Sequence, residues 1–295
     1  MGIRHWKSWF LATRPKSLTT ALVPILVGTA LAYAIHHQVQ LFLSVFALLS
    51  ALLIQIGTNL INDAMDFKKG ADTAERIGPR RSIQNGILNS RVVWWGGIIC
   101  FIISLVFGIP LVLSGGFPIL IIGFFSLLAG YAYTGGPFPL AYLGLGDLFV
   151  IIFYGWIAVG GVYYLHTGEI DFPAIIAGSQ VGFLATVLIA INNLRDSHTD
   201  RKANKRTLAV RWGIRFARVE ITGLCFLPFC GSFFWYLQGF HWAAFLPIGM
   251  LPVAVILVQK VRNTEPHAVY NQIFSQGAFL HLGFGILLSL GLSFQ

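Results

Sequence analysis

The feature that most constrains this chain is a series of apolar runs, each long enough to cross a bilayer as a helix. About 20 consecutive apolar residues span the hydrocarbon core of a membrane. The sequence therefore predicts an all-α integral membrane protein with about nine transmembrane helices in a single domain over residues 1–295. The nine runs, with approximate bounds, are 18–35, 41–65, 92–113, 117–134, 145–165, 173–194, 215–237, 241–260 and 270–292.

The composition agrees with a membrane protein. Hydrophobic residues make up 56% of the chain and charged residues only 11%, whereas soluble domains carry about 25% charged residues. The three cysteines lie in apolar runs, without the spacing of a metal site or a disulfide framework. We expect all three, Cys100, Cys225 and Cys230, to be buried packing residues.

Lysine and arginine are confined to one side of the predicted membrane. If the connections alternate between two sides, all 20 Lys and Arg residues fall on the side of the N-terminal segment. The connections on the other side, HHQVQ, SGG, HTGEID and QGFH, contain none. The positive-inside rule then places the N-terminus in the cytoplasm and the C-terminus outside. We expect a multi-pass protein of the cytoplasmic (inner) membrane. Because this topology explains the net charge of +9, we do not expect nucleic acid as a partner.

Two acidic clusters lie where even-numbered runs reach the cytoplasmic side. The first is in the stretch NLINDAMDFKKGAD, and the second opens the stretch NNLRDSHTDRKANKRTLAVRWG. Spacings of three and four residues place each set on one face of a helix, and basic residues follow each cluster. The first cluster holds Asn59, Asn62, Asp63 and Asp66, and the second holds Asn192, Asp196 and Asp200.

Carboxylates gathered at a membrane boundary call for a cationic partner, since like charges on one helix face repel each other. Hard oxygen donors suit Mg²⁺, which often binds through one or two carboxylates together with substrate phosphates. Neighbouring Lys and Arg side chains would hold the same phosphates. One such cluster alone is usually a solvated helix end, but two on the same side of the membrane indicate a Mg²⁺–diphosphate site. The alternatives are a cation-coupled secondary transporter and a lipid-binding scaffold without chemistry.

These motifs resemble those of the UbiA superfamily of intramembrane aromatic prenyltransferases. The resemblance rests on NDAMDFKKGAD, on ERIGPRRSIQNG after it, and on NNLRDSHTDRKANKRTLAVRWG. WFLATRPKSLTTALVPILVGTALA and YTGGPFPLAYLGLGDLFV extend it over roughly residues 8–215. GPRR and KRTLAVRWG are most similar to the branch that prenylates 1,4-dihydroxy-2-naphthoate in menaquinone synthesis. The resemblance implies a UbiA-type bundle of nine membrane helices.

The resemblance also implies two Mg²⁺ ions that bridge a prenyl diphosphate, with Mn²⁺ as an alternative metal. The superfamily often has an Asp four residues after Asp66, where this chain has Gly70, and Asp72 lies two residues further on. The implied metal ligands are Asn62, Asp63, Asp66, Asp72, Asn192, Asp196 and Asp200. The residues implied to be catalytic are Asp63, Asp66, Asp196 and Asp200, and those implied to bind diphosphate are Lys68, Arg80, Arg81, Lys202 and Arg206.

The aromatic residues suit a reaction that passes through a carbocation. An allylic diphosphate that loses diphosphate leaves a cation, which aromatic faces stabilise by about 0.5–2 kcal/mol each and which water would quench. The segment YAYTGGPFPLAYLGLGD breaks the helical pattern near the cytoplasmic face, so we expect Tyr131, Tyr133 and Tyr142 to line the aromatic and prenyl pocket. We expect Asp147 to cap the next helix and His198 to be a surface histidine.

The predicted reaction transfers a polyprenyl group from polyprenyl diphosphate to 1,4-dihydroxy-2-naphthoate. As the resemblance implies, CO₂ and diphosphate are lost and demethylmenaquinone is formed. 4-Hydroxybenzoate and homogentisate are the alternative acceptors within the same enzyme class. A transporter would instead depend on an ion gradient and survive EDTA, and a scaffold would show no turnover.

Overall fold

The computed structural model describes residues 2–37, 39–70, 77–78, 81, 83–84 and 86–294. Every regular element in this part of the chain is helical, as predicted. The α-helices are α1 (Gly2–Ala12), α2 (Thr19–His36), α3 (Leu41–Lys68), α4 (Ser90–Ala132), α5 (Gly146–Val150), α6 (Ala158–Thr167), α7 (Phe172–Arg195), α8 (Ser197–Lys202), α9 (Leu208–Leu237), α10 (His241–Phe245), α11 (Leu251–Asn263) and α12 (Tyr270–Ser293). The 3₁₀ helices are η1 (Pro15–Ser17) and η3 (Leu246–Met250), and η2 (Ile151–Ile157) is a π-helix.

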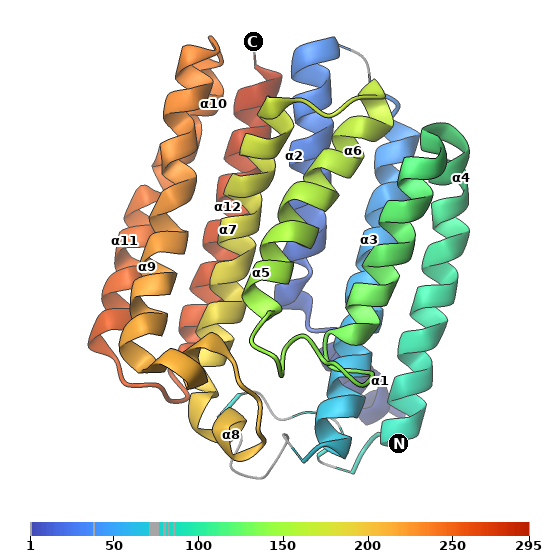
Figure 1. Ribbon diagram of the computed structural model, residues 1–295, viewed down its shortest axis with the longest axis vertical. Coiled ribbons are helices and arrows are strands. Elements are labelled where there is room, and N and C mark those ends of the chain that lie inside the picture. Colours follow the sequence, from blue (N-terminus) through green and yellow to red (C-terminus); the bar gives the residue numbers. More distant parts are fainter. Residues whose placement is uncertain are drawn as a thin grey trace.

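Eight helical segments within the described ranges are long and apolar enough to cross a membrane. One of them, α4, has 43 residues, which would make a straight helix of about 65 Å, twice the thickness of the hydrocarbon core. Gly116 interrupts α4 with φ 65° and ψ −152°, a conformation that is essentially restricted to glycine. The two halves of α4 run in opposite directions (Figure 1). Because α4 holds two crossings, the predicted number of nine is confirmed for the part of the chain that is described.

The predicted burial of all three cysteines is wrong for one of them. Cys225 is buried and Cys100 is half-buried, but Cys230 is exposed. Cys225 and Cys230 both lie on α9, which packs against α7, α10 and α11. Leu227 and Phe233 on the same helix are exposed as well, and an exposed apolar side chain of a membrane helix can contact lipid.

Helix α7 is the most buried crossing and forms the centre of the bundle. It contacts α9, α12, α2 and η2. At the contact with η2, a Cβ atom on Gly155 would lie 2.4 Å from the carbonyl oxygen of Gly178 and 3.0 Å from Cα of Gly182. Small residues of this kind allow membrane helices to approach closely. The contact therefore holds the backbone of η2 directly against α7.

The C-terminal ends of α3 and α7 lie at the same end of the bundle as the N-terminus (Figure 1). Helices α1 and α8 and the connection over residues 133–145 lie at this end as well. The chain end after α12 lies at the opposite end of the bundle. Because the two acidic clusters occupy the ends of α3 and α7, the fold brings them to one side of the predicted membrane.

Candidate active site

The last turns of α3 place the first acidic cluster in the protein interior. Asn59, Asn62, Asp63 and Asp66 share one helix face, and each is at most 6% exposed. The helix continues to Lys68 because neither glycine nor proline interrupts the stretch NLINDAMDFK. Buried carboxylates are unfavourable unless cations pair with them. The two aspartates therefore require positively charged neighbours.

Two arginines supply these charges. Both terminal nitrogens of Arg81 donate to Oδ2 of Asp66 at 3.1 Å, and Nε of Arg81 lies 3.1 Å from Oδ1 of Asp63. Arg14 also forms an ion pair with Asp63. Arg14 lies between α1 and η1 with a left-handed backbone (φ 53°). Arg14, which precedes α2, and Arg81, which follows α3, thus both contact Asp63.

The second acidic cluster forms where α7 ends and α8 begins. The amide of Asp196 donates to the carbonyl of Asn192 at 2.9 Å, and the amide of Asp200 donates to the carbonyl of Asp196 at 2.8 Å. Arg195 donates two hydrogen bonds to Asp196, from Nε to Oδ1 at 2.8 Å and from Nη2 to Oδ2 at 2.7 Å. Nζ of Lys205 lies 3.5 Å from Oδ1 of Asp200. The predicted helical spacing of the cluster is therefore present.

Asp200 has one carboxylate oxygen that fits a metal ion. Its Oδ2 is buried and accepts no hydrogen bond from any residue that the structure describes. Burial raises the pKa of Asp200 to about 6; Lys205 opposes this rise, and Asp196 and Asp66 add to it. Asn62 and Asp63 of the first cluster and Asn192 of the second line the same cavity, so the two clusters lie close together. A buried carboxylate oxygen beside other carboxylates is the type of donor that binds Mg²⁺.

Tyr142 connects the two clusters. Its hydroxyl donates to Oδ1 of Asp66 at 3.0 Å, and its carbonyl accepts from the amide of Arg206 at 3.0 Å. Nζ of Lys69 lies 4.5 Å and Nζ of Lys205 5.9 Å from the centre of the Tyr142 ring. Burial, and then the charge of Asp66, raise the pKa of the Tyr142 hydroxyl. Tyr142 therefore stays protonated and acts as a hydrogen-bond donor at neutral pH.

The connection between α4 and α5 also orients the amide of the first cluster. Oγ1 of Thr134 donates to Oδ1 of Asn62 at 2.6 Å. Nζ of Lys69 in turn donates to the carbonyl of Thr134 at 2.7 Å. The end of α3 and the α4–α5 connection thus hold each other in place.

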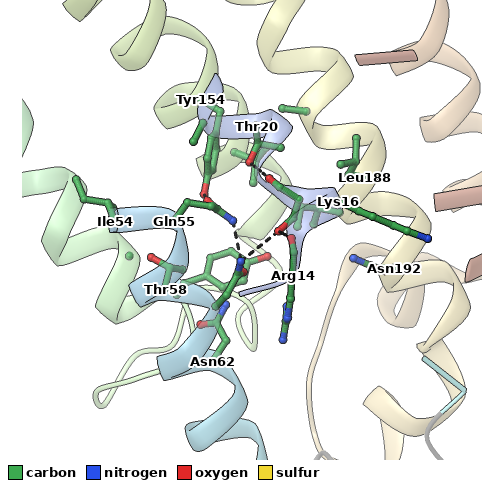
Figure 2. Close-up of a pocket in the computed structure, with 18 of the residues that line it drawn as sticks. Arg14, Lys16, Thr20, Ile54, Gln55, Thr58, Asn62, Tyr154, Leu188 and Asn192 are labelled. Carbon is green, nitrogen blue, oxygen red and sulfur yellow. Dashed lines mark hydrogen bonds between the residues drawn. The ribbon is translucent and has the colours of Figure 1, made fainter. Parts of the chain in front are cut away.

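A cavity of about 480 Å³ opens beside the first cluster. It is charged at one end and apolar along much of its wall, which suits an amphiphilic ligand with an anionic head group. Figure 2 shows Arg14, Lys16, Asn62 and Asn192 around the charged end. The charged and amide residues there are Arg14, Lys16, Asn62, Asp63, Arg81, Asn192 and Arg195, and the apolar lining includes Ala51, Ile54, Phe149, Phe153, Leu188 and Ile189.

Most of the residues that were predicted to bind metal or diphosphate lie close together in the structure. Asp72 and Arg80 lie outside the described residues. Lys68, Lys202 and Arg206 are exposed and do not line the cavity, so their contact with diphosphate stays a prediction. The predicted residues that lie at the site are Asn62, Asp63, Asp66, Arg81, Asn192, Asp196 and Asp200.

The three tyrosines that were expected in the pocket occupy different positions. Tyr133 lines the cavity, and Tyr142 binds Asp66 outside it. Tyr131 is half-buried and is absent from the cavity lining among the described residues. His198 is exposed on α8, as expected.

Asp147 does not cap α5, so this prediction is wrong. The N-cap residue is Leu145, and no side chain makes a capping hydrogen bond there. Asp147 is 4% exposed, and Nδ2 of Asn193 lies 3.4 Å from each of its carboxylate oxygens. Because α5 packs against α7, the carboxylate is directed into the contact between these helices.

Several residues at the site were not predicted from the sequence. The basic ones belong to a set of 20 Lys and Arg on one side of the membrane, and no spacing separates them from the rest. The polar ones lie inside apolar runs, which was a usable signal, because polar groups within membrane helices are commonly functional. These residues are Arg14, Lys16, Gln55, Lys69, Tyr154, Arg195 and Lys205.

Residues 21–282 match the UbiA prenyltransferase family. A 1,4-dihydroxy-2-naphthoate octaprenyltransferase from Haemophilus influenzae is 36% identical over 299 residues, which cover 97% of this chain and 96% of that protein. A protein of the same name from Escherichia coli is 39% identical over 217 residues, which cover 72% of this chain and 70% of that protein.

Solved structures of distant relatives have the same fold. A UbiA homolog from Archaeoglobus fulgidus bound to DMAPP and Mg²⁺ has a TM-score of 0.61 at 18% identity, over 96% of this chain and 99% of that chain. The apo structure of a UbiA homolog from Aeropyrum pernix has a TM-score of 0.69 at 13% identity, over 92% and 97%. The match over most of the chain, together with the helical bundle, shows that this multi-pass membrane protein belongs to the UbiA prenyltransferase family.

Proposed function

We propose that this protein transfers a polyprenyl group from polyprenyl diphosphate to 1,4-dihydroxy-2-naphthoate, with loss of CO₂ and diphosphate, to give demethylmenaquinone. The observation that carries the proposal is that residues of both acidic clusters, Asn62, Asp63 and Asn192, line the charged end of one largely apolar cavity. The choice of acceptor is supported by five relatives named 1,4-dihydroxy-2-naphthoate octaprenyltransferase. Their names also make octaprenyl diphosphate the first donor to test.

The four central aspartates are assigned to two Mg²⁺ ions, with Mn²⁺ as an alternative. Bound Mg²⁺ would neutralise the charge that develops on the departing diphosphate. The carboxylates fit this role because they are buried, belong to two segments that face each other, and include the buried Oδ2 of Asp200. The assigned aspartates are Asp63, Asp66, Asp196 and Asp200, with Asn62, Asp72 and Asn192 as the remaining candidate ligands.

The arginines beside these aspartates are assigned to the phosphate oxygens. Arg14, Arg81 and Arg195 all line the cavity and already contact Asp63, Asp66 or Asp196. A guanidinium group binds phosphate with two parallel hydrogen bonds. In this assignment the arginines compensate the carboxylates before the substrate binds and hold the diphosphate afterwards.

The apolar part of the cavity is assigned to the reacting prenyl and aromatic groups. Its wall excludes water, which would otherwise quench an allylic cation. Phe149, Phe153 and Tyr133 line this space, and aromatic faces stabilise a nearby cation. An electron-rich ring carbon of the acceptor would then attack the cation.

The proposed orientation places the active site at the cytoplasmic face of the inner membrane. All Lys and Arg residues lie in or next to the connections on that side, and the acidic clusters lie at the same end of the bundle as the N-terminus. The positive-inside rule assigns this end to the cytoplasm and the C-terminus to the outside.

The test uses purified full-length protein in detergent with octaprenyl diphosphate and Mg²⁺. The acceptors 1,4-dihydroxy-2-naphthoate, 4-hydroxybenzoate and homogentisate are offered separately, and product masses are measured with and without EDTA. We expect a prenylated naphthoquinone product and diphosphate release that EDTA abolishes and Mg²⁺ or Mn²⁺ restores.

Product with 4-hydroxybenzoate or homogentisate alone would contradict the assigned acceptor. Folded protein that forms no product with any acceptor would contradict prenyl transfer altogether. An uptake assay in vesicles with an ion gradient would then test the transporter alternative.

A further inference from the structure

A strip of polar side chains crosses the apolar wall of the cavity. It consists of Asn59, Gln55 and Tyr154, all of which line the cavity. Figure 2 shows Gln55 and Tyr154 meeting above the charged end. Gln55 is 7% exposed, and polar groups buried in membrane helices are costly unless they are paired or functional. The metal and diphosphate assignments leave this polar strip unexplained.

The direction of the hydrogen bonds along the polar strip is determined at one end. Nδ2 of Asn59 donates to the backbone carbonyl of Thr13 at 3.0 Å and to Oγ of Ser17 at 3.1 Å. Because a carbonyl can only accept, Oδ1 of Asn59 must be turned towards Gln55. Nε2 of Gln55 donates to that oxygen at 3.4 Å. Oε1 of Gln55 is therefore turned towards Tyr154.

Tyr154 is consequently the donor in its hydrogen bond to Gln55. A phenol has one proton and two lone pairs, so the Tyr154 oxygen can only accept further hydrogen bonds. Thr20 also lines the cavity, but its proton is donated to the carbonyl of Ser17 at 2.7 Å. The polar strip thus presents an acceptor at the cavity wall, and a ligand that pairs with it must be a donor.

The backbone around Tyr154 holds this oxygen in place. Tyr154 lies in the π-helix η2. This conformation is rare in proteins, and where it occurs it is often at a functional site. The next residue, Gly155, packs directly against the backbone of Gly178 and Gly182 on α7. Phe153, on the other side of Tyr154, also lines the cavity. The contact of Gly155 with α7 fixes the backbone from which the Tyr154 side chain extends towards Gln55.

The polar strip is separated from the charged end by a distance that suits an aromatic acceptor. Gln55 and Asp63 lie on the same helix, about 12 Å apart along its axis. A ring bound between them would point its reacting carbon at the prenyl carbon near the diphosphate. One hydroxyl of a 1,4-dihydroxy ring is on the carbon next to the reacting one. The other hydroxyl is one ring carbon further away and points away from the diphosphate, so this hydroxyl can reach Tyr154.

We propose that Tyr154, oriented by Gln55, accepts a hydrogen bond from a ring hydroxyl of the acceptor and thereby selects for a 1,4-dihydroxy ring. This inference rests on the proposed prenyl transfer to a hydroxynaphthoate. A naphthoate without the second hydroxyl would leave the Tyr154 oxygen without a donor in an apolar wall. Sites that pair a buried polar group with a substrate hydroxyl discriminate strongly against the analogue that lacks it.

The test compares 1,4-dihydroxy-2-naphthoate with 1-hydroxy-2-naphthoate, which lacks the second hydroxyl. The KM of the first compound and the Ki of the second as a competitive inhibitor are measured with full-length protein, octaprenyl diphosphate and Mg²⁺. Tyr154→Phe is expected to raise the KM of the dihydroxy compound about tenfold, the size of one hydrogen bond. The Ki of the monohydroxy compound and the KM of octaprenyl diphosphate should change by less than about twofold.

Tyr164→Phe is the matched control, since Tyr164 lies on the adjoining helix α6 and is not part of the described cavity lining. It should leave both acceptor constants unchanged. Gln55→Leu removes the group that receives the Tyr154 proton and should also reduce the discrimination, which keeps the test usable if Tyr154→Phe lowers the melting temperature.

Unchanged discrimination in both variants, with wild-type protein active on the dihydroxy compound, overturns this inference and leaves the proposed function intact. Wild-type protein that prenylates no hydroxynaphthoate overturns the proposed function and this inference with it.

Discussion

The two ends of the helical bundle both gather polar side chains, but they differ in burial and charge. At the end that holds the C-terminus, the hydroxyl of Tyr163 lies 3.1 Å from Nε2 of His36 and donates to Oδ2 of Asp171 at 2.6 Å. Oε1 of Glu169 lies 3.4 Å from the same histidine nitrogen. His36, Glu169 and Asp171 are close enough together that one metal ion could contact all three. We call these residues and Tyr163 the outer network.

The outer network lacks the burial and the cationic partners of the aspartates at the opposite end of the bundle, which we call the inner end. The side chains of His36 and Glu169 are 33% and 56% exposed, whereas those of the four inner aspartates are at most 13% exposed. Arginine or lysine pairs with each inner aspartate, and the connections of the outer end contain neither residue type. Proximity of acidic groups therefore does not identify a site. The inner end combines buried carboxylates, cationic partners and a cavity, and for this reason we propose the active site there.

The largest expected effect separates activity from stability at the inner end. Asp200→Asn should lower kcat/KM by about 10²–10³-fold, because the proposed function assigns this carboxylate to the metal that neutralises the departing diphosphate. The melting temperature should stay the same or rise, because the buried charge of Asp200 is costly and Asn has the same shape. Steady-state kinetics and thermal unfolding measure the two effects. A parallel fall in activity and melting temperature would make Asp200 a structural residue.

The second-largest effect is expected at the close contact between η2 and α7, midway between the two ends of the bundle. Gly155→Ala should lower stability by about 1–3 kcal/mol, because its Cβ would lie 2.4 Å from the carbonyl oxygen of Gly178. Gly160→Ala is the matched control further along the same crossing, where a Cβ meets no atom within 4 Å. Thermal unfolding in detergent compares the two variants. Equal melting temperatures would contradict the close contact between η2 and α7.

The smallest effect is expected at the outer network. Asp171→Asn should change kcat/KM by less than about twofold, because Asp171 lies at the other end of the bundle from the cavity. It should change stability by at most about 1 kcal/mol, because Asp171 is half-buried and the Asn oxygen can still accept the hydrogen bond from Tyr163. The same kinetic and unfolding measurements apply. A loss of activity comparable to that of Asp200→Asn would remove the distinction between the two ends.

The crossings and the acidic clusters could be predicted because their signals are local in the sequence. A run of apolar residues is sufficient to define a membrane helix, and a carboxylate at its end is unusual enough to be noticed without knowledge of the fold. Gly116 lies between two predicted runs, so even the break in α4 was anticipated as a connection.

The cationic partners could not be predicted because tertiary structure selects them from many similar residues. Lys68 and Lys69 are adjacent, yet α3 ends at Lys68 and only Lys69 turns back to the carbonyl of Thr134. Lys205 reaches Asp200, whereas its neighbour Arg206 contributes its backbone to Tyr142. Differences of one residue at a helix end thus decide which charge enters the site.

The measurement that tests the central account most directly is the binding of inorganic diphosphate to full-length protein by titration calorimetry. Wild-type protein, Asp66→Asn, Asp200→Asn and the double variant are each titrated with Mg²⁺ and with EDTA. The two-cluster account predicts binding only with Mg²⁺, and a double variant that loses little more than either single variant, because one site needs both clusters. Diphosphate binding that persists in EDTA, or losses in the two single variants that add independently, would contradict it.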